Sequence, residues 1–207
     1  MNSTDQIVET HIHRDDVGSR MGMWLFLFTE LLLFGGMFLL YSVYRFEYAE
    51  QFHIAAKELN IILGTFNTAV LLTSSMTMAL SITAIERGNK NLSILFQLIT
   101  VAFGILFLVN KYIEWSAEIS AGNYPGSTAL DAKGHGQIIF YGLYYTMTGL
   151  HALHVVVGMT IIAVMCSFTV KDVINKDNYV RLEAAGLYWH LVDIIWIFLF
   201  PLFYLIN

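Results

Sequence analysis

The stretch that decides the fold is GLYWHLVDIIWIFLFPLFYLIN, residues 186–207, at the end of the chain. It is long enough to cross a bilayer as one helix, yet it carries His190 and Asp193 near its middle. Side chains three residues apart lie on the same face of a helix. Because an ionisable pair in hydrocarbon is costly, this face is expected to point into protein. Two interpretations follow for the pair: a polar contact that fixes helix packing, or a site that binds a ligand or handles protons.

The composition of the whole chain is that of a membrane protein. Of the 207 residues, 57% are hydrophobic and 13% are charged, whereas about a quarter of the residues in a soluble domain carry charge. Five stretches nearly free of charge meet the requirement of about 20 residues for a transmembrane helix. The expected spans are 21–44, 59–85, 91–115, 137–170 and 184–206. We therefore predict an all-α integral membrane protein, with a bundle of five transmembrane helices in one domain, 21–207.

The N-terminal arm, residues 1–20, is polar and mixed in charge, with no apolar core, so no signal peptide is expected. His11 and His13 lie in this arm, and two histidines without a third ligand indicate a tail rather than a metal site. The single cysteine, Cys166, excludes an intrachain disulfide.

The distribution of basic residues predicts the orientation in the membrane. With five spans, the segments on the N-terminal side contain seven lysines and arginines: Arg14, Arg20, Arg87, Lys90, Lys171, Lys176 and Arg181. Those on the other side contain four: Arg45, Lys57, Lys111 and Lys133. Since cytoplasmic segments carry the excess of positive charge, we expect a cytoplasmic N-terminus and a periplasmic C-terminus.

Further polar residues fall within the expected spans. Glu30 lies in the first, where a carboxylate must be protonated, paired or next to a hydrated crevice. His151 and His154 lie three residues apart in the fourth. A packing seam is expected on one face of the second span, with polar residues at a period of seven. Its members are Asn60, Gly64, Asn67, Ser74 and Ser81.

Three classes of membrane protein place ionisable residues at this depth. A b-type haem protein uses two histidines on facing helices for each haem, and three histidines on two spans allow at most one such site. A small transporter is expected to show broken helices or an internal repeat, and the sequence has no repeat and one intramembrane proline, Pro201. A non-catalytic subunit, whose buried charges neutralise each other and which contacts lipid or a partner, requires no cofactor. The residues favour this third class.

Four stretches resemble subunit III of the haem–copper respiratory oxidases, in its five-helix bacterial form. MWLFLFTE (23–30) looks like the first conserved segment with its buried glutamate, and NTAVLLTSS (67–75) resembles the next helix. FYGLYYTMTGLHALHVVVG (140–158) is similar to the TG-xHxxHV-xxG signature. YWHLVDIIW (188–196) is similar to the YWHFVDxxW ending, with Leu191 where phenylalanine is usual. The four stretches span nearly the whole chain in the order of the family.

The resemblance implies a non-catalytic subunit of an oxygen-reducing, proton-translocating terminal oxidase in the bacterial cytoplasmic membrane. Its partner would be the catalytic subunit I, which holds the haems and copper, within a complex that can extend to a respiratory supercomplex; no nucleic acid is expected. Such a subunit supports assembly, stability and proton uptake, and binds no haem, copper or other metal itself. Bound phospholipid is compatible with this role, although the two extra helices that complete the family's lipid cleft are not expected here. The family's buried polar framework corresponds to Glu30, Glu114, His151, His154, His190 and Asp193.

The sequence is compatible with three complexes: a cytochrome c oxidase, a quinol oxidase, or a nitric oxide reductase in which the chain would be an accessory subunit. The breadth of the family favours a cytochrome c oxidase. For the framework, we expect Glu30 to meet a histidine of the fourth span. We expect Asp193 to pair within the last span or with the fourth.

Overall fold

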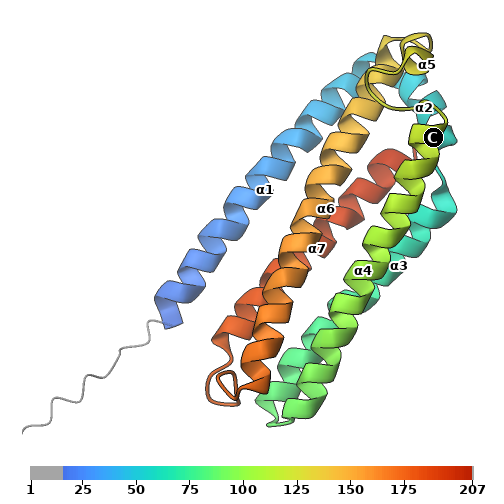
Figure 1. Ribbon diagram of the computed structural model, residues 1–207. Helices are drawn as coiled ribbons and strands as arrows, with labels where there is room; N and C mark the ends of the chain where they lie inside the picture. Colours follow the sequence, from blue (N-terminus) through green and yellow to red (C-terminus); the bar gives the residue numbers. More distant parts are fainter. Residues whose placement is uncertain (1–15, 207) are drawn as a thin grey trace, which may run out of the picture.

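The computed structural model describes residues 16–206, and these residues form a bundle of long helices (Figure 1). The helices are α1 (Asp16–Glu47), α2 (Ala49–Glu58), α3 (Ile61–Glu86), α4 (Lys90–Ser120), α5 (Thr128–Asp131), α6 (His135–Val170) and α7 (Val180–Tyr204). Five of them, α1, α3, α4, α6 and α7, are long and apolar enough to cross a membrane. The predicted all-α fold with five spanning helices is confirmed.

Helix α7 lies at the centre of the arrangement. It packs against α1, α3 and α6, while α3 and α4 form a closely packed hairpin beside it. In Figure 1, α1 runs along one side of the bundle and the α3–α4 hairpin along the other. The indoles of Trp189 and Trp196 on α7 are fully buried, whereas most side chains of α1 are exposed. The C-terminal stretch 186–207 therefore lies largely in the helix around which the others pack.

Glycines make room for the largest side chain of this core. A Cβ atom on Gly158 of α6 would lie 2.8 Å from a ring carbon of Trp189, and one on Gly104 of α4 would lie 2.6 Å from the Met159 sulfur. Small residues of this kind allow membrane helices to approach closely. The Trp189 indole fills the space at Gly158, and the Met159 side chain and the edge of the same indole fill the space at Gly104.

The observed helix bounds differ from the expected ones at the membrane surfaces. Helix α1 begins at Asp16, inside the expected arm, and α4 continues past Trp115 to Ser120. Helix α6 runs without a break from His135. Residues 1–15, with His11 and His13, lie outside the described part of the chain. The thickness of the hydrocarbon core determines how long the apolar segment of a helix must be. A helix can continue beyond that segment into water, so hydropathy does not predict where these helices end.

Helix α2 was not predicted. It buries Phe52, Ala55 and Ala56 and leaves Glu50 and Lys57 exposed. Its apolar residues follow helical spacing, but the segment is too short and too polar to register as a span. Packed against α6, it covers the same end of the bundle as the short helix α5 (Figure 1).

Candidate functional site

Glu30 and His154 form a contact between α1 and α6. The His154 Nε2 atom lies 2.8 Å from a carboxylate oxygen of Glu30, and its Nδ1 atom lies 2.7 Å from the carbonyl oxygen of Leu150. The two side chains are 15% and 14% exposed, respectively. The prediction that Glu30 meets a histidine of the fourth span is confirmed. Both ring nitrogens of His154 are engaged, so the contact satisfies a carboxylate and an imidazole that would otherwise face hydrocarbon.

His151 lies in the centre of the bundle. Its ring is fully buried between Phe107 of α4 and Trp196 of α7, with ring centroids 5.5 and 5.2 Å away. Within residues 16–206, neither ring nitrogen has a hydrogen-bonding partner. Although His151 and His154 are three residues apart, only His154 reaches α1 and only His151 contacts α4, while both rings lie near aromatic rings of α7. Three residues turn a helix by about 60° less than a full circle.

The pairing expected for Asp193 is wrong. Asp193 is 2% exposed, and neither of its carboxylate oxygens has a hydrogen-bonding partner among the described residues. It lies near the hydroxyl of Ser75 on α3, and within residues 16–206 it forms no hydrogen bond with a group of α6 or α7. That hydroxyl lies 2.6 Å from Nδ1 of His190. Ser75 thus links α3 to the polar face of α7, which the spacing of His190 and Asp193 could not reveal.

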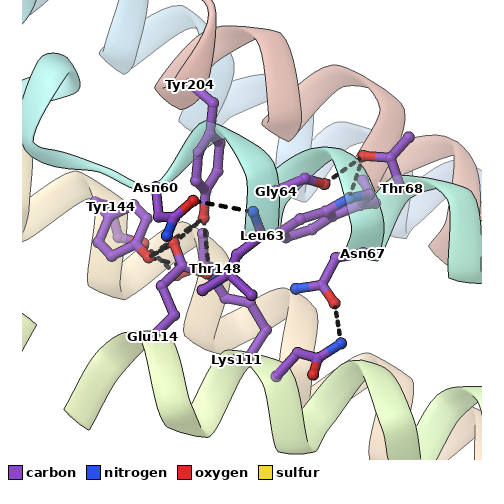
Figure 2. Close-up of polar contacts among 12 residues, drawn as sticks. Asn60, Leu63, Gly64, Asn67, Thr68, Lys111, Glu114, Tyr144, Thr148 and Tyr204 are labelled. Atoms are coloured by element: carbon purple, nitrogen blue, oxygen red, sulfur yellow. Dashed lines mark hydrogen bonds and ion pairs between the residues drawn. The ribbon is translucent and has the colours of Figure 1, made fainter. Parts of the chain in front are cut away.

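Glu114 belongs to a buried cluster of four polar side chains from α4, α6 and α7 (Figure 2). Lys111 Nζ donates to the Glu114 carboxylate at 3.0 Å and to the hydroxyls of Tyr144 and Tyr204 at 3.0 and 2.9 Å. Both hydroxyls donate to the other carboxylate oxygen of Glu114. Lys111 and Glu114 are 3% and 2% exposed. Every polar group of the cluster is therefore paired inside the bundle.

Sequence reasoning missed Lys111, Tyr144 and Tyr204 as members of this cluster. Lys111 was placed in an outer segment because it follows the uncharged part of the third span. The spacing of Lys111 and Glu114, three residues apart on a helix, was the available signal, because such residues are neighbours on one face. The tyrosines come from distant parts of the chain and gave no local signal.

A second polar cluster lies at one end of the bundle, where α2 meets the start of α6. Lys133 Nζ lies 2.8 Å from a carboxylate oxygen of Glu58, and the Tyr141 hydroxyl and the Asn123 amide donate to the same oxygen at 2.8 and 3.0 Å. Burial by itself favours the neutral acid, but the hydrogen bonds from Lys133 and Tyr141 outweigh it and hold the pKa of Glu58 below its usual range. The cluster ties α2 to the α4–α6 connection.

The predicted seam of α3 contacts two helices. Asn67 accepts a hydrogen bond from Asn110 of α4 at 2.9 Å, and Ser81 lies 3.3 Å from the hydroxyl of Ser93 on α4. Ser74 accepts a hydrogen bond from the Trp189 indole of α7 at 3.1 Å. Gly64 faces the rings of Phe200 and Tyr204 on α7.

Asn60 does not belong to this seam. It is exposed, and its side chain accepts hydrogen bonds from the backbone N–H groups of Ile62 and Leu63, at 3.0 and 3.1 Å (Figure 2). Asn60 is therefore the N-cap of α3, a position that favours asparagine because its oxygen satisfies the free N–H groups of the first turn.

These observations agree with comparison to known proteins. Residues 2–207 match the family described as cytochrome c oxidase subunit III. The chain belongs to this family.

Relatives within the subunit III family carry different names. The cytochrome c oxidase subunit 3 of Synechocystis is 32% identical over 209 residues, which cover 100% of this chain and 84% of that protein. The probable quinol oxidase subunit 3 of Staphylococcus haemolyticus is 28% identical over 209 residues, 100% and 98% of the two chains. The heme-copper oxidase subunit I+III of Aeropyrum pernix is 31% identical over 195 residues, 90% of this chain but 22% of that protein.

In this member of the subunit III family, the polar side chains within the membrane join helices to one another. Glu30 joins α1 to α6, Glu114 joins α4 to α6 and α7, and His190 joins α7 to α3. Within residues 16–206, no three histidine, cysteine, aspartate or glutamate side chains lie together as a metal site would require. Chemically, the arrangement neutralises buried charge and fixes helix packing.

Proposed function

We propose that this chain is a non-catalytic subunit III of a haem–copper terminal oxidase that transfers electrons from cytochrome c to oxygen and translocates protons. In that role it supports the assembly, stability and proton uptake of the catalytic subunit. The observation that carries the proposal is the match to the cytochrome c oxidase subunit III family over residues 2–207. Glu30, a carboxylate within the first span, is held by His154, as a structural contact requires.

We propose that the haems and copper of the complex belong to the partner and that this chain holds neither. The imidazole nitrogens support this division. Both nitrogens of His154 are engaged by Glu30 and Leu150, and His151 is enclosed by aromatic rings. A bis-histidine haem needs one free nitrogen on each of two facing helices, so His151 and His154, which share α6, cannot form such a site together. His190 on α7 has its Nδ1 atom engaged by Ser75, and the His151 ring is packed against Phe107 and Trp196.

The proposed partner is the catalytic subunit I of the same oxidase, alone or within a larger respiratory complex. The Aeropyrum pernix relative supports this choice, because its name joins subunits I and III in a single protein. We further propose the bacterial cytoplasmic membrane as the location, with the N-terminus in the cytoplasm. Seven basic residues lie on that side; on the other, Lys111 is buried inside the bundle, which leaves Arg45, Lys57 and Lys133, and this excess supports the orientation.

One purification experiment identifies both the partner subunit and the electron donor of the complex. The tagged chain is purified from its native membranes in mild detergent, and its reduced-minus-oxidised absorbance spectrum and co-purifying proteins are recorded. We expect haem absorbance that accompanies a larger membrane subunit and disappears when this chain is isolated. Oxidation of reduced cytochrome c by the complex is expected; oxidation of a quinol instead would assign the role named for the Staphylococcus haemolyticus relative. Haem that stays with the isolated chain would overturn the proposal.

A further inference from the structure

One imidazole within the membrane, that of His190, has a ring nitrogen without a hydrogen bond in the described part of the chain and lies at the surface of the bundle. The His190 imidazole is half-buried, and its Nδ1 atom lies 2.6 Å from the Ser75 hydroxyl. Within residues 16–206, no hydrogen bond reaches its Nε2 atom. Behind it lies Asp193, 2% exposed and with both carboxylate oxygens unpartnered in the same part of the chain. His190 and Ser75 both lie far from the ends of their helices, at a depth where lipid offers no hydrogen bond.

The surface around His190 differs from a surface that faces lipid. On α3, Leu72 and Ala79 are exposed on either side of Ser75, and on α7, Ile194 is exposed one turn after His190. We call these five residues (Leu72, Ser75, Ala79, His190 and Ile194) the α3/α7 face. Its centre combines a small residue with two polar ones, a composition typical of contacts between membrane helices.

The outward face of α4 provides the contrast within the same hairpin. Between Leu92 and Val109, and apart from Ala102, its exposed residues are large and aliphatic: Leu92, Leu95, Leu98, Ile105, Leu106 and Val109. No polar side chain interrupts this series between Leu92 and Val109, all of which lie in the described part of the chain. The α4 face therefore has the composition expected against acyl chains.

We propose that the α3/α7 face packs against a transmembrane helix of the catalytic subunit, and that this helix places a hydrogen-bonding side chain opposite Nε2 of His190. The inference rests on the proposed function and specifies the surface through which that function is exerted. A lipid tail in the same place would leave the imidazole nitrogen unsatisfied, at a cost of several kcal/mol. A helix with a polar side chain satisfies the imidazole, and Ala79 lets its backbone approach.

A matched pair of substitutions tests the proposal in the whole complex. Ala79→Trp places a bulky ring on the α3/α7 face, and Ala102→Trp places the same ring on the α4 face. Both alanines are exposed, so neither substitution disturbs the core of this chain. The hydrogen bond between Thr77 and Thr100, 2.8 Å long, fixes the register of this antiparallel hairpin, and at 1.5 Å per residue it places the two alanines about 6 Å apart in depth, on either side of that contact. The measured quantity is the ratio of haem-bearing subunit to tagged chain after purification in mild detergent.

We expect Ala79→Trp to lower this ratio by about fivefold or more, since overpacking a contact costs about 1–3 kcal/mol. Ala102→Trp is expected to leave the ratio unchanged. Equal ratios for the two variants and the unsubstituted chain would overturn the inference while leaving the proposed function intact. A chain that purifies without any haem-bearing subunit, even unsubstituted, would overturn both.

Cross-linking provides a readout that does not depend on a bulky substitution. In a Cys166→Ala background, Ala79→Cys and Ala102→Cys are labelled in membranes with a photoactivatable maleimide. We expect the label at position 79 to form an adduct with the catalytic subunit and the label at position 102 to react with lipid alone. Adducts at position 79 with lipid alone, or with a second copy of this chain, would overturn the proposal.

Discussion

Replacing Lys111 by methionine should destabilise the chain, because it removes one charge of an ion pair enclosed by three helices. The Lys111 ammonium and the Glu114 carboxylate are 3.0 Å apart and almost fully buried. Methionine has a similar length and no charge, so the substitution leaves little empty space. It leaves a carboxylate in the interior of a membrane bundle without its counter-charge.

The expected size of the effect follows from this geometry. At 3.0 Å, and with an effective dielectric constant of about 20, the attraction within the pair is roughly 5–6 kcal/mol. Tyr144 and Tyr204 still donate hydrogen bonds to Glu114 after the substitution, so part of the stabilisation of the carboxylate remains. We therefore expect a loss of about 3 kcal/mol in the free energy of unfolding, at the lower end of the range for breaking a buried pair.

A double substitution separates the charge from the packing. Lys111→Met combined with Glu114→Gln removes both charges, and we expect it to recover about 2 kcal/mol relative to Lys111→Met alone. The free energies are measured by denaturant unfolding in detergent, followed by fluorescence; Trp196, whose ring lies 5.3 Å from Lys111 Nζ, is a local probe. A loss below about 1 kcal/mol for the single variant, or a double variant no more stable than the single, would refute the reasoning.

Three further predictions concern other parts of the chain. Glu30→Gln keeps a hydrogen-bonding side chain at the α1–α6 contact, so the complex should assemble normally and lose only a modest part of its oxygen consumption. The pKa of Glu58 is lower in the folded chain than in the unfolded one, so its contribution to stability is present above the unfolded pKa and is lost as the pH falls through the folded pKa. Acid titration of stability from about pH 5 downward should therefore show a steeper loss for the unsubstituted chain than for Glu58→Gln. Gly158→Ala should destabilise by about 1–3 kcal/mol in thermal or denaturant unfolding, because its Cβ would lie 2.8 Å from a Trp189 ring carbon. Gly36→Ala, whose Cβ meets nothing within 4 Å, is the matched control; without a clash it should lose no stability and should gain up to about 1 kcal/mol, because alanine favours a helix interior over glycine.

Each of these predictions has a contrary result. Complete loss of oxygen reduction in an assembled Glu30→Gln complex would show that this carboxylate is more than a structural contact. Parallel acid titrations of Glu58→Gln and the unsubstituted chain would mean that Lys133 does not hold the carboxylate in its charged form. Equal stabilities for the two glycine variants would show that the core relaxes around the added methyl group.

The buried polar residues show which contacts a local sequence pattern can predict and which it cannot. Glu30 was identified from its position in an apolar run, and its partner was expected on the fourth span, where the only two histidines are three residues apart. The choice between His151 and His154 depended on how α6 is rotated relative to α1. Lys111 was counted among the basic residues outside the membrane because it follows the uncharged part of the third span, whereas its buried partner Glu114 keeps it inside the bundle.

The sequence by itself determined the class of the protein, the number of spanning helices and the family, because hydropathy and the motifs of the fourth and fifth spans are local properties of the chain. The tertiary structure decided which polar groups meet. It brought Tyr144 and Tyr204 to Glu114, placed Ser75 beside His190 and left Asp193 without a partner among the described residues. These contacts depend on the rotation and depth of helices that are far apart in sequence. In hydrocarbon, where every polar group needs a partner, rotation and depth are set by all the helices together.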